Sequence, residues 1–392
     1  MKLRINIATT LLILALSPIL LFSQKTVVNP IYKLINNKND SISTSITSVA
    51  NFINNNFKSE EEKAKAIFYW TTKNIAYDIE NQYTFSFNLN KPKTTEKAFY
   101  TKKAVCYGYA CLFDTLCRLS NLKSQIVIGS VRQTSSDQNL IAHAWNACFI
   151  NQKWVLFDPT WGAGTINNRT FTGKLNEKYL ASTNLSETHH PFDPIWQLSN
   201  DPLNQREFFN PKFKKTAPLF SFNYYDSITF FLNQSSTAKL KSVRNRLKND
   251  GIEGDAAYAY YSYLETLIMN IATKDYNNIV ASYNYASDMY NEYINFKNKQ
   301  FTPTKPDSEI KSMITDPEGV IEKCKKELIA LPNDYADLNE NSKRLLKNIT
   351  DFEPRIAEEK QFVEKYLQTP PKKRKDLFYK KVYTFWGIPL NK

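Results

Sequence analysis

The sequence is poor in several residue types that common sites and scaffolds require. Its 392 residues include 9 glycines, 5 cysteines, 4 methionines and 3 histidines. An odd number of cysteines in so long a chain excludes a disulfide-based scaffold, which small secreted domains use in place of a large core. Scarce glycine, together with abundant asparagine, lysine and tyrosine, favours helical structure with polar surfaces over an all-β barrel.

Metal-binding motifs are also missing from the cysteines. Cys106, Cys111 and Cys117 lie close together, but the gaps between them are not those of a CxxC zinc motif. We therefore expect no metal ion and no organic cofactor. Cys111 and Cys117 are interpreted as small buried hydrophobic residues. The question that remains is whether Cys106 is a nucleophile or a third buried side chain.

Positive charge exceeds negative charge, with 51 Lys and Arg against 38 Asp and Glu and a net charge of +13. The basic residues are scattered and do not form a motif that reads RNA or DNA, so we expect no nucleic-acid partner. The run PPKKRK at residues 370–375 is interpreted as a solvated basic stretch. Contact with an anionic surface is the alternative.

The N-terminus has the pattern of a secretory signal peptide. Lys2 and Arg4 precede an apolar run over residues 7–22, and Ser23 supplies a small residue for cleavage. We expect residues 1–23 to be removed and the mature protein to be periplasmic or extracellular. An uncleaved anchor is the alternative. The sequence holds no second long apolar stretch, so no transmembrane segment is expected in the mature chain.

The rest of the chain is long enough for two domains. We expect a polar, partly helical segment at residues 24–58, a core domain at 59–200, a connecting segment at 201–235 and an α-helical accessory domain at 236–392. Three to five helices are expected in the last of these, since helix-breaking stretches fall at residues 249–255, 302–307 and 331–335. Its many tyrosines are expected to pack between helices; a protein-binding or glycan-binding surface is the alternative.

Apolar periodicity predicts three helices in the first half of the chain. One is an amphipathic helix at residues 42–57. Ser59 and Glu62 have capping-box spacing at the start of the second, in which Trp70 is interpreted as a packing residue. The third extends over residues 106–119 and begins at the cysteine cluster.

Three strand-like runs follow, at residues 124–132, 141–150 and 153–161. Only Asn151 and Gln152 separate the last two, which predicts a tight hairpin whose opposed positions sum to about 303. Asp158 would then lie opposite residue 145, one diagonal step from His143. That step is within reach of a hydrogen bond if the strand bends.

These positions favour a nucleophile with its base. A cysteine at a helix N-terminus generally has a lowered thiol pKa, because the helix dipole and the unpaired N–H groups stabilise the thiolate. His143 could take and return the proton, and Asp158 could hold the imidazole in place. The alternatives are a buried structural role for Cys106 and a turn cap for Asp158. The pair His189 and His190 predicts a loop at the surface or behind the site.

The residues around these positions resemble the transglutaminase-like superfamily. The resemblance is carried by Cys106 in AVCYGYA, His143 in AHAWN and Asp158 in VLFDPTW, in that order and at that spacing. KAKAIFYWTTKNIAYD before them and HHPFDPIWQL after them are most similar to the kyphoscoliosis-peptidase-like branch, which includes animal proteins and exported bacterial ones. The resemblance implies an α+β, papain-like fold, with a cysteine-bearing helix packed on an antiparallel sheet, followed here by the mainly α-helical part.

The resemblance implies acyl transfer through a thioester on Cys106, with His143 as base and then acid and Asp158 as the orienting carboxylate. Val105 stands where animal transglutaminases carry Gln, and their long Ca²⁺-binding insertions are missing from this sequence. We therefore expect hydrolysis or acyl transfer at an amide bond of a protein or peptide, without a calcium switch. Candidate groove or supporting residues are Tyr107, Gly108, Trp145 and Trp161.

A second class of function is compatible with the same residues, because a fold does not fix a function. Some transglutaminase-like proteins have lost activity. In that alternative the chain is a catalytically silent binding or scaffold protein of the cell envelope. Its helical part would then recognise an envelope polymer or a partner protein.

Overall fold

The computed structural model describes residues 29–82, 90–132, 140–210, 213, 222–332 and 336–379, and the backbone of residues 384–385 and 388–389. The expected signal peptide lies outside the described residues. The helices are α1 (Pro30–Ile42), α2 (Ile46–Asn56), α3 (Glu60–Asn74), α4 (Lys91–Thr101), α5 (Cys106–Leu119), α6 (Pro159–Ala163), α7 (Gln205–Phe209), α8 (Tyr224–Leu232), α9 (Ser236–Asp250), α10 (Gly254–Asn298), α11 (Asp307–Ile329) and α12 (Ala336–Gln368), with the 3-10 helices η1 (Glu177–Tyr179), η2 (Pro194–Gln197) and η3 (Pro371–Phe378). The strands are β1 (Ala76–Tyr77), β2 (Lys103–Ala104), β3 (Lys123–Val131), β4 (Ile141–Ile150), β5 (Lys153–Phe157), β6 (Gly164–Asn167), β7 (Thr170–Gly173), β8 (His189–Pro191), β9 (Thr384–Phe385) and β10 (Ile388–Pro389).

The described residues fall into two compact units. One comprises residues 29–82, 91–126 and 145–182, and the other comprises residues 90, 127–132, 140–144 and those from 183 onward. The division passes within β3 and β4, which are continuous strands of a single four-stranded sheet in the order β5-β4-β3-β8. The four strands therefore form one hydrogen-bonded sheet.

The hairpin of β4 and β5 has the predicted register. Its paired positions, from Asn146 with Phe157 down to the turn, sum to 303 throughout. Asn151 and Gln152 form the two-residue turn, with φ of 49° and 62°. Both values lie in the left-handed region that a type I′ hairpin turn requires, and asparagine tolerates that region better than most residues. The turn therefore fixes which residues of the two strands face each other.

Strand β5 is shorter than predicted. The sequence pattern predicts a strand to residue 161, but β5 ends at Phe157 and α6 begins at Pro159. Asp158 is the N-cap of α6, and proline at the first helical position loses no hydrogen bond there. The cap and the proline together turn the chain from strand to helix.

The N-terminal segment forms two helices, so the single helix predicted at residues 42–57 is wrong in its extent. α1 ends at Ile42 and α2 begins at Ile46. The Ser45 hydroxyl accepts the Ser48 N–H at 3.0 Å and so caps α2. A serine in extended conformation at this N-cap separates the two helices.

Helix α3 begins as predicted. Ser59 and Glu62 form a complete capping box, in which each side chain accepts the other residue's backbone N–H. Trp70 is buried, stacks on Phe99 with ring centroids 5.6 Å apart, and donates its indole N–H to the Ser43 hydroxyl at 3.0 Å. These contacts make Trp70 a packing residue of the core, as predicted.

Helix α5 is the centre of the core that carries the sheet. It packs against α2, α3, α4 and α6. Phe113 on α5 contacts Phe157 on β5, with ring centroids 5.1 Å apart. Cys117 on α5 meets Cys148 on β4 with 3.8 Å between sulfur atoms, and both side chains are fully buried. The cysteine-bearing helix and the sheet therefore share one apolar core, which confirms the α+β fold.

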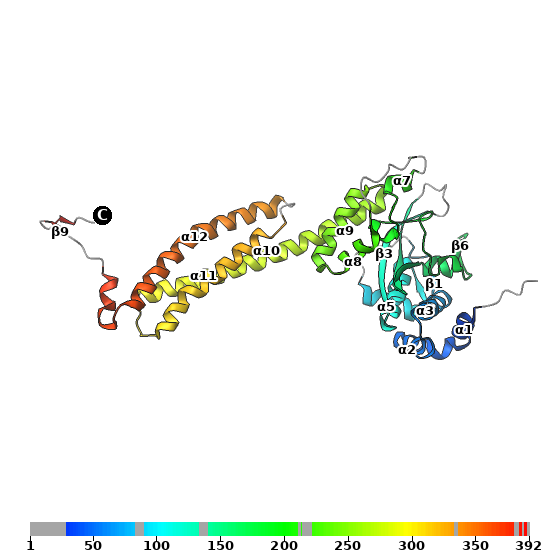
Figure 1. Cartoon of the computed structure of the whole chain (residues 1–392), viewed down its shortest axis with the longest axis horizontal. Helices are drawn as coiled ribbons and strands as arrows, with labels where there is room; N and C mark the ends of the chain where they lie inside the picture. The colour runs from blue at the N-terminus through cyan, green and yellow to red at the C-terminus, as the bar shows by residue number, and fades with distance from the viewer. Residues whose placement is uncertain are drawn as a thin grey trace, which may run out of the picture. The chain divides into compact units, whose positions relative to one another are not determined.

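Helices α10, α11 and α12 lie side by side and share a separate apolar core (Figure 1). The core residues recur at helical intervals and include Ile279, Ala286, Tyr293, Phe296, Ile310, Ile314, Ile321, Leu345, Ile349, Ile356 and Val363. Helix ends fall at or next to the predicted breaks, so the mainly α-helical character of this part is confirmed. Within the described ranges, no helix has both the length and the apolar character needed to cross a membrane.

Some tyrosines of α10 pack between helices and others are exposed at the surface. Tyr276, Tyr283 and Tyr290 pack against the helical core, and Tyr293 is part of it. Tyr285 is 62% exposed. Packing is therefore the main use of these side chains, as predicted, and no continuous tyrosine surface is needed to explain them.

Candidate active site

Cys106 is the first residue of α5, as predicted. Its side chain is 5% exposed. The carbonyl of Val105 accepts the backbone N–H groups of both Gly108 and Tyr109, which closes the first turn of the helix. The N–H groups of the first helical residues point out of the end of a helix, so the thiol sits at the positive end of the helix dipole.

Gly108 allows this end of α5 to approach its neighbours closely. A Cβ atom at this position would lie 2.7 Å from the Cβ of Ala104 on β2, closer than two carbon atoms can pack. Tyr109 then ties the first turn to the end of α3, because its hydroxyl donates to the Ile75 carbonyl. The nucleophile candidate is therefore held by backbone packing and not by a flexible loop.

The second turn of α5 is fastened to the sheet by a buried amide. Asn146 on β4 donates from Nδ2 to the carbonyl of Ala110 at 3.0 Å, and its side chain is fully buried. Its hydrogen-bond partner is therefore the cysteine-bearing helix. His143 precedes Asn146 by three residues on the same strand, so the hydrogen bond also fixes the section of β4 that carries His143.

Asp158 has a structural role that the sequence left as an alternative to catalysis. Its Oδ1 accepts the N–H groups of Thr160 at 2.9 Å and Trp161 at 3.0 Å, and its own N–H donates to the Tyr179 carbonyl at 3.0 Å. The side chain is fully buried. Because Oδ1 is used by the cap of α6, an imidazole N–H would be accepted by Oδ2.

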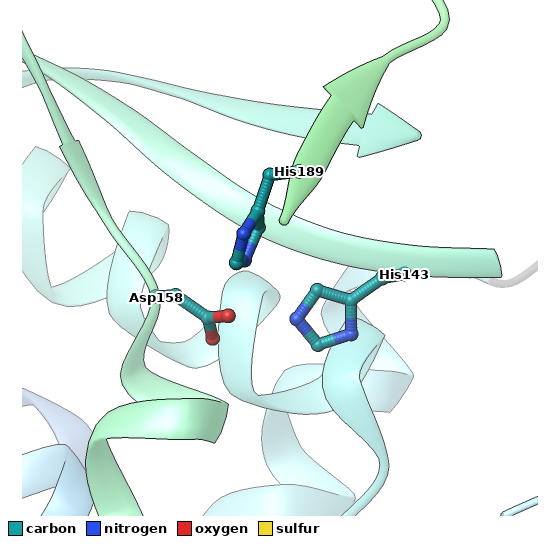
Figure 2. A group of neighbouring side chains, drawn as sticks. All are labelled: His143, Asp158 and His189. Atoms are coloured by element: carbon teal, nitrogen blue, oxygen red, sulfur yellow. The ribbon is translucent and has the colours of Figure 1, made fainter. Parts of the chain in front are cut away.

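Three buried side chains converge on the space next to this cap. One nitrogen or oxygen atom each from His143, Asp158 and His189 lies within 4.8 Å of the other two. Figure 2 shows the two imidazoles and the carboxylate pointing toward one another from β4, from the start of α6 and from β8. The His143 and His189 ring centroids are 5.8 Å apart and the ring planes are inclined by 70°. The diagonal His143–Asp158 approach expected from the hairpin register is therefore present.

His189 was missed as a site residue. It pairs with Val131 across β3 and β8, is 3% exposed, and has Nδ1 2.8 Å from the Thr188 hydroxyl oxygen. The predicted loop is wrong, because His189 and His190 are buried on strand β8. Of the two positions expected for them, the surface is excluded and the position behind the site remains. The available signal was the segment HHPFDPIWQL, which resembles the kyphoscoliosis-peptidase-like branch and begins with His189.

His190 faces a different environment from its neighbour. Its Nε2 lies 2.9 Å from the Leu203 carbonyl and 3.2 Å from Gln197 Nε2. Burial lowers the pKa of His190 to about 4, so the ring is neutral at ordinary pH. The nearby carboxyl of Asp250, 3.6 Å away, has its pKa raised by burial. This histidine therefore belongs to the supporting core.

The other titratable groups near the cap are held in their neutral forms. Burial, and after it the charges of Tyr77 and Asp158, raise the pKa of Tyr109 well above its usual value. Burial and Asp158 raise the pKa of Tyr179 to about 12. Burial also raises the pKa of the Cys111 thiol to about 12. Neither these phenols nor this thiol can serve as a base at neutral pH, which leaves the histidines for that role.

The remaining predicted residues support the site in different ways. Trp145 is fully buried beside His143 in the sequence and belongs to the core. Trp161 is half-buried and meets Tyr179 edge to face, with ring centroids 5.4 Å apart. Tyr107 is half-buried on the first turn of α5. Of the two tryptophans, only Trp161 is placed to line an accessible surface.

Comparisons with known proteins match the part of the chain that holds this site. Residues 47–159 match the family model of the transglutaminase-like superfamily. Kyphoscoliosis peptidase of Mus musculus is 33% identical over 167 residues, which are 40% of this chain and 25% of that protein. The Homo sapiens kyphoscoliosis peptidase is 34% identical over 164 residues, 40% of this chain and 24% of its own length.

The chain thus spans about a quarter of the length of the curated relatives that it matches. A solved structure of a TGase aligns with 40% of this chain and 39% of its own, with 20% identity and a TM-score of 0.25.

Proposed function

We propose that this chain cleaves an amide bond, or transfers its acyl group, through Cys106. The support is the match of residues 47–159 to the transglutaminase-like superfamily and of the chain to kyphoscoliosis peptidases, within a family of cysteine hydrolases and acyltransferases. The substrate is a protein or peptide. His143 is the general base and then the general acid, and Asp158 is the residue that positions His143. The observation that carries the proposal is the convergence of His143 with Asp158 at a cap that packs against the cysteine-bearing helix.

The first step forms a thioester. The sulfur of Cys106 attacks the amide carbonyl carbon while His143 takes the thiol proton. The carbonyl electron pair moves onto oxygen, where backbone N–H groups at the start of α5, including that of Cys106, stabilise the negative charge. When the intermediate collapses, the C–N bond breaks and His143 gives its proton to the leaving amine.

The second step releases the acyl group. A water molecule or an amine attacks the thioester carbonyl and loses its proton to His143, and the C–S bond breaks to return the Cys106 thiol. Water gives a carboxylic acid and an amine gives a new amide. Asp158, fixed by the α6 cap, keeps the His143 ring in the orientation that serves both steps.

Export is the second part of the proposal. Its support is the signal-peptide pattern of residues 1–23. The protein then acts in the periplasm or outside the cell. The intact mass of the protein purified from the producing cells tests this point: a chain that begins near residue 24 supports export, and a chain that retains residues 1–23 contradicts cleavage.

A second candidate function is supported by burial of the triad. Cys106 is 5% exposed, His143 is 3% exposed and Asp158 is fully buried. A site so covered suits a silent binding or scaffold protein of the envelope as well as an enzyme that opens for its substrate. The two candidates differ in whether the thiol of Cys106 is activated by His143.

Alkylation of Cys106 as a function of pH separates these candidates. The labelling rate is followed by peptide mass spectrometry in the wild-type protein and in His143→Ala. Cys111 serves as an internal control, because burial raises the pKa of its thiol to about 12. We expect rapid labelling of Cys106 at pH values where an isolated thiol, with a pKa of about 8.5, reacts slowly, and loss of that advantage in His143→Ala.

An ordinary thiol profile for Cys106 that His143→Ala leaves unchanged would reject the catalytic proposal. The silent scaffold would then be the function to test, beginning with binding of envelope polymers to the helical part. Labelling of Cys111 at the same rate as Cys106 would show that the protein had unfolded, and the folded state would be checked by circular dichroism before the rates are compared.

A further inference from the structure

His143 and Asp158, which have roles in the proposed reaction, lie with His189 in a group of side chains that could bind a metal ion. We propose that they bind one divalent transition-metal ion of the zinc type, and that the bound ion stops acyl transfer at Cys106. Binding follows from the three ligands alone, whereas its inhibitory effect rests on the proposed function of His143.

The donor atoms are already close to the required spacing. One atom from each residue lies within 4.8 Å of the other two. Zinc–nitrogen and zinc–oxygen bonds of about 2.0–2.2 Å place tetrahedral ligand atoms about 3.3–3.6 Å apart. Metal binding therefore requires the three side chains, which come from β4, the start of α6 and β8, to move closer together (Figure 2).

The composition of the cluster selects the class of ion. Two imidazoles and one carboxylate are the protein ligands of many zinc sites that keep a fourth position open. Calcium and magnesium prefer all-oxygen sites, so the two nitrogen donors disfavour them. Zinc, copper(II) and nickel(II) accept imidazole readily, and zinc tolerates a tetrahedral arrangement best.

Neighbouring groups hold two of the ligands in place. Thr188 Oγ1 lies 2.8 Å from Nδ1 of His189, which assigns Nε2 to the metal. The N–H groups of Thr160 and Trp161 hold Oδ1 of Asp158, which assigns Oδ2 to the metal. Such supporting hydrogen bonds orient the ligands of known metal sites and raise their affinity.

The consequence for chemistry follows from the lone pairs. A metal ion beside Asp158 binds the His143 nitrogen that faces this carboxylate, so the proton of the neutral ring moves to the other nitrogen. That nitrogen then has no lone pair for the Cys106 proton, and the thiol loses its base. Binding therefore competes with catalysis for the same side chain. His189 has no step in the proposed reaction, so its substitution tests the metal site separately from the base.

Zinc competition against a chromogenic chelator tests the binding. The assay uses the full chain carrying Cys106→Ala, so that neither the thiol nor the reaction contributes. We expect one equivalent of zinc and at least a tenfold weaker affinity after adding His189→Ala or His143→Ala. His190→Gln is the matched control, because His190 is the third histidine of the chain and its Nε2 lies against Leu203.

The outcomes separate the metal site from the catalytic proposal. Zinc affinity that His189→Ala and the milder His189→Asn both leave unchanged, in variants shown to be folded by circular dichroism, overturns the metal site. Zinc that binds with the expected ligand dependence but does not slow alkylation of Cys106 in the wild-type chain overturns the inhibition alone. Slower alkylation in zinc, reversed by a chelator and absent in His189→Asn, supports both.

Discussion

The core around α5 and the core shared by α10, α11 and α12 bury different kinds of side chain. The first contains fully buried polar groups, among them Asp114, Asn146 and Asp158. Each has partners: Asp114 forms ion pairs with Lys91 and Arg118, for example. The second core consists of isoleucine, leucine, phenylalanine, tyrosine, alanine, valine and one cysteine.

The difference in buried polar groups follows from the different roles of the two cores. Burying a polar group costs free energy unless its hydrogen bonds are replaced, so a core built only for stability has little reason to contain many. Around α5, the Asn146 amide holds the cysteine-bearing helix to β4 and the Asp158 carboxylate caps α6. In the helical core the ion pairs lie at the edge, as between Lys325 on α11 and Glu353 on α12.

Substitution of Asp158 is expected to have the largest effect, because this residue caps α6 and is also part of the candidate active site. Asp158→Asn keeps an oxygen that can accept the α6 N–H groups but removes the charge that positions His143. We expect the rate of acyl transfer to fall about 10²- to 10⁴-fold. Asp158→Ala should lose the rate and, in addition, about 1 kcal/mol of unfolding free energy with the cap. Single-turnover kinetics and urea unfolding of both variants check this, and an equal loss of stability in the two would contradict the division of roles.

Ile349→Ala should lower the stability of the helical core and leave the candidate active site unchanged. Ile349 is fully buried among the apolar residues of α12, so truncation leaves a cavity and should cost about 2–5 kcal/mol. Hydrogen exchange of α10, α11 and α12 measures the loss. The alkylation rate of Cys106 should stay as in the wild-type protein; a matching drop in that rate would mean that the helical core also sets the geometry of the site.

The stability of the protein should depend on pH through the buried side chain of His190. His190 has a folded pKa of about 4 against an unfolded value near 6.5, so the unfolded chain binds the extra proton between these pH values. Its contribution is therefore present above pH 6.5 and is lost as the pH falls toward 4, by about 3 kcal/mol in all. Denaturant unfolding at pH 7 and pH 4.5 should show a smaller pH effect in His190→Gln. An undiminished effect in that variant would assign the pH dependence to other groups.

The smallest effect is expected at the edge of the helical core. Lys325 and Glu353 form an ion pair at 2.7 Å, but about a third of each side chain is exposed. Lys325→Gln should cost about 0–1 kcal/mol, because solvent and salt screen such pairs. Thermal unfolding at low and high salt measures it. A cost of several kcal/mol that salt does not reduce would place this pair inside the core.

The features predicted correctly from the sequence are those that depend on residues close together in the chain. Capping-box spacing gave the start of α3 at Ser59, and the two residues Asn151 and Gln152 gave a hairpin register that holds to the last pair. Cys106 at the start of a helix followed from apolar periodicity alone. These features depend on hydrogen bonds and side-chain spacing within a few residues, which the sequence states directly.

Prediction failed where tertiary partners decide. His189 and His190 look like a loop beside Pro191, yet β3 pairs with this segment and buries both rings. The strand expected to continue to residue 161 stops because Asp158 caps a helix whose packing against α5 no local pattern reveals. Asn146 gave no sign of its partner, since Ala110 lies 36 residues away in the sequence.

Helix α10 has a mechanical consequence. At 1.5 Å per residue its 45 residues extend about 68 Å, and the helix is free of proline. Ala257 and Leu264 near its start pack in one apolar cluster with Phe192 and Leu247, while Ile279 and the residues after it pack in another. Because one continuous helix contributes residues to both clusters, the helix fixes the rotation of one cluster about the helix axis relative to the other. Inserting a single residue between them would turn the far cluster by about 100°, whereas inserting seven, close to two full turns, would restore the phase and move it about 10 Å along the axis.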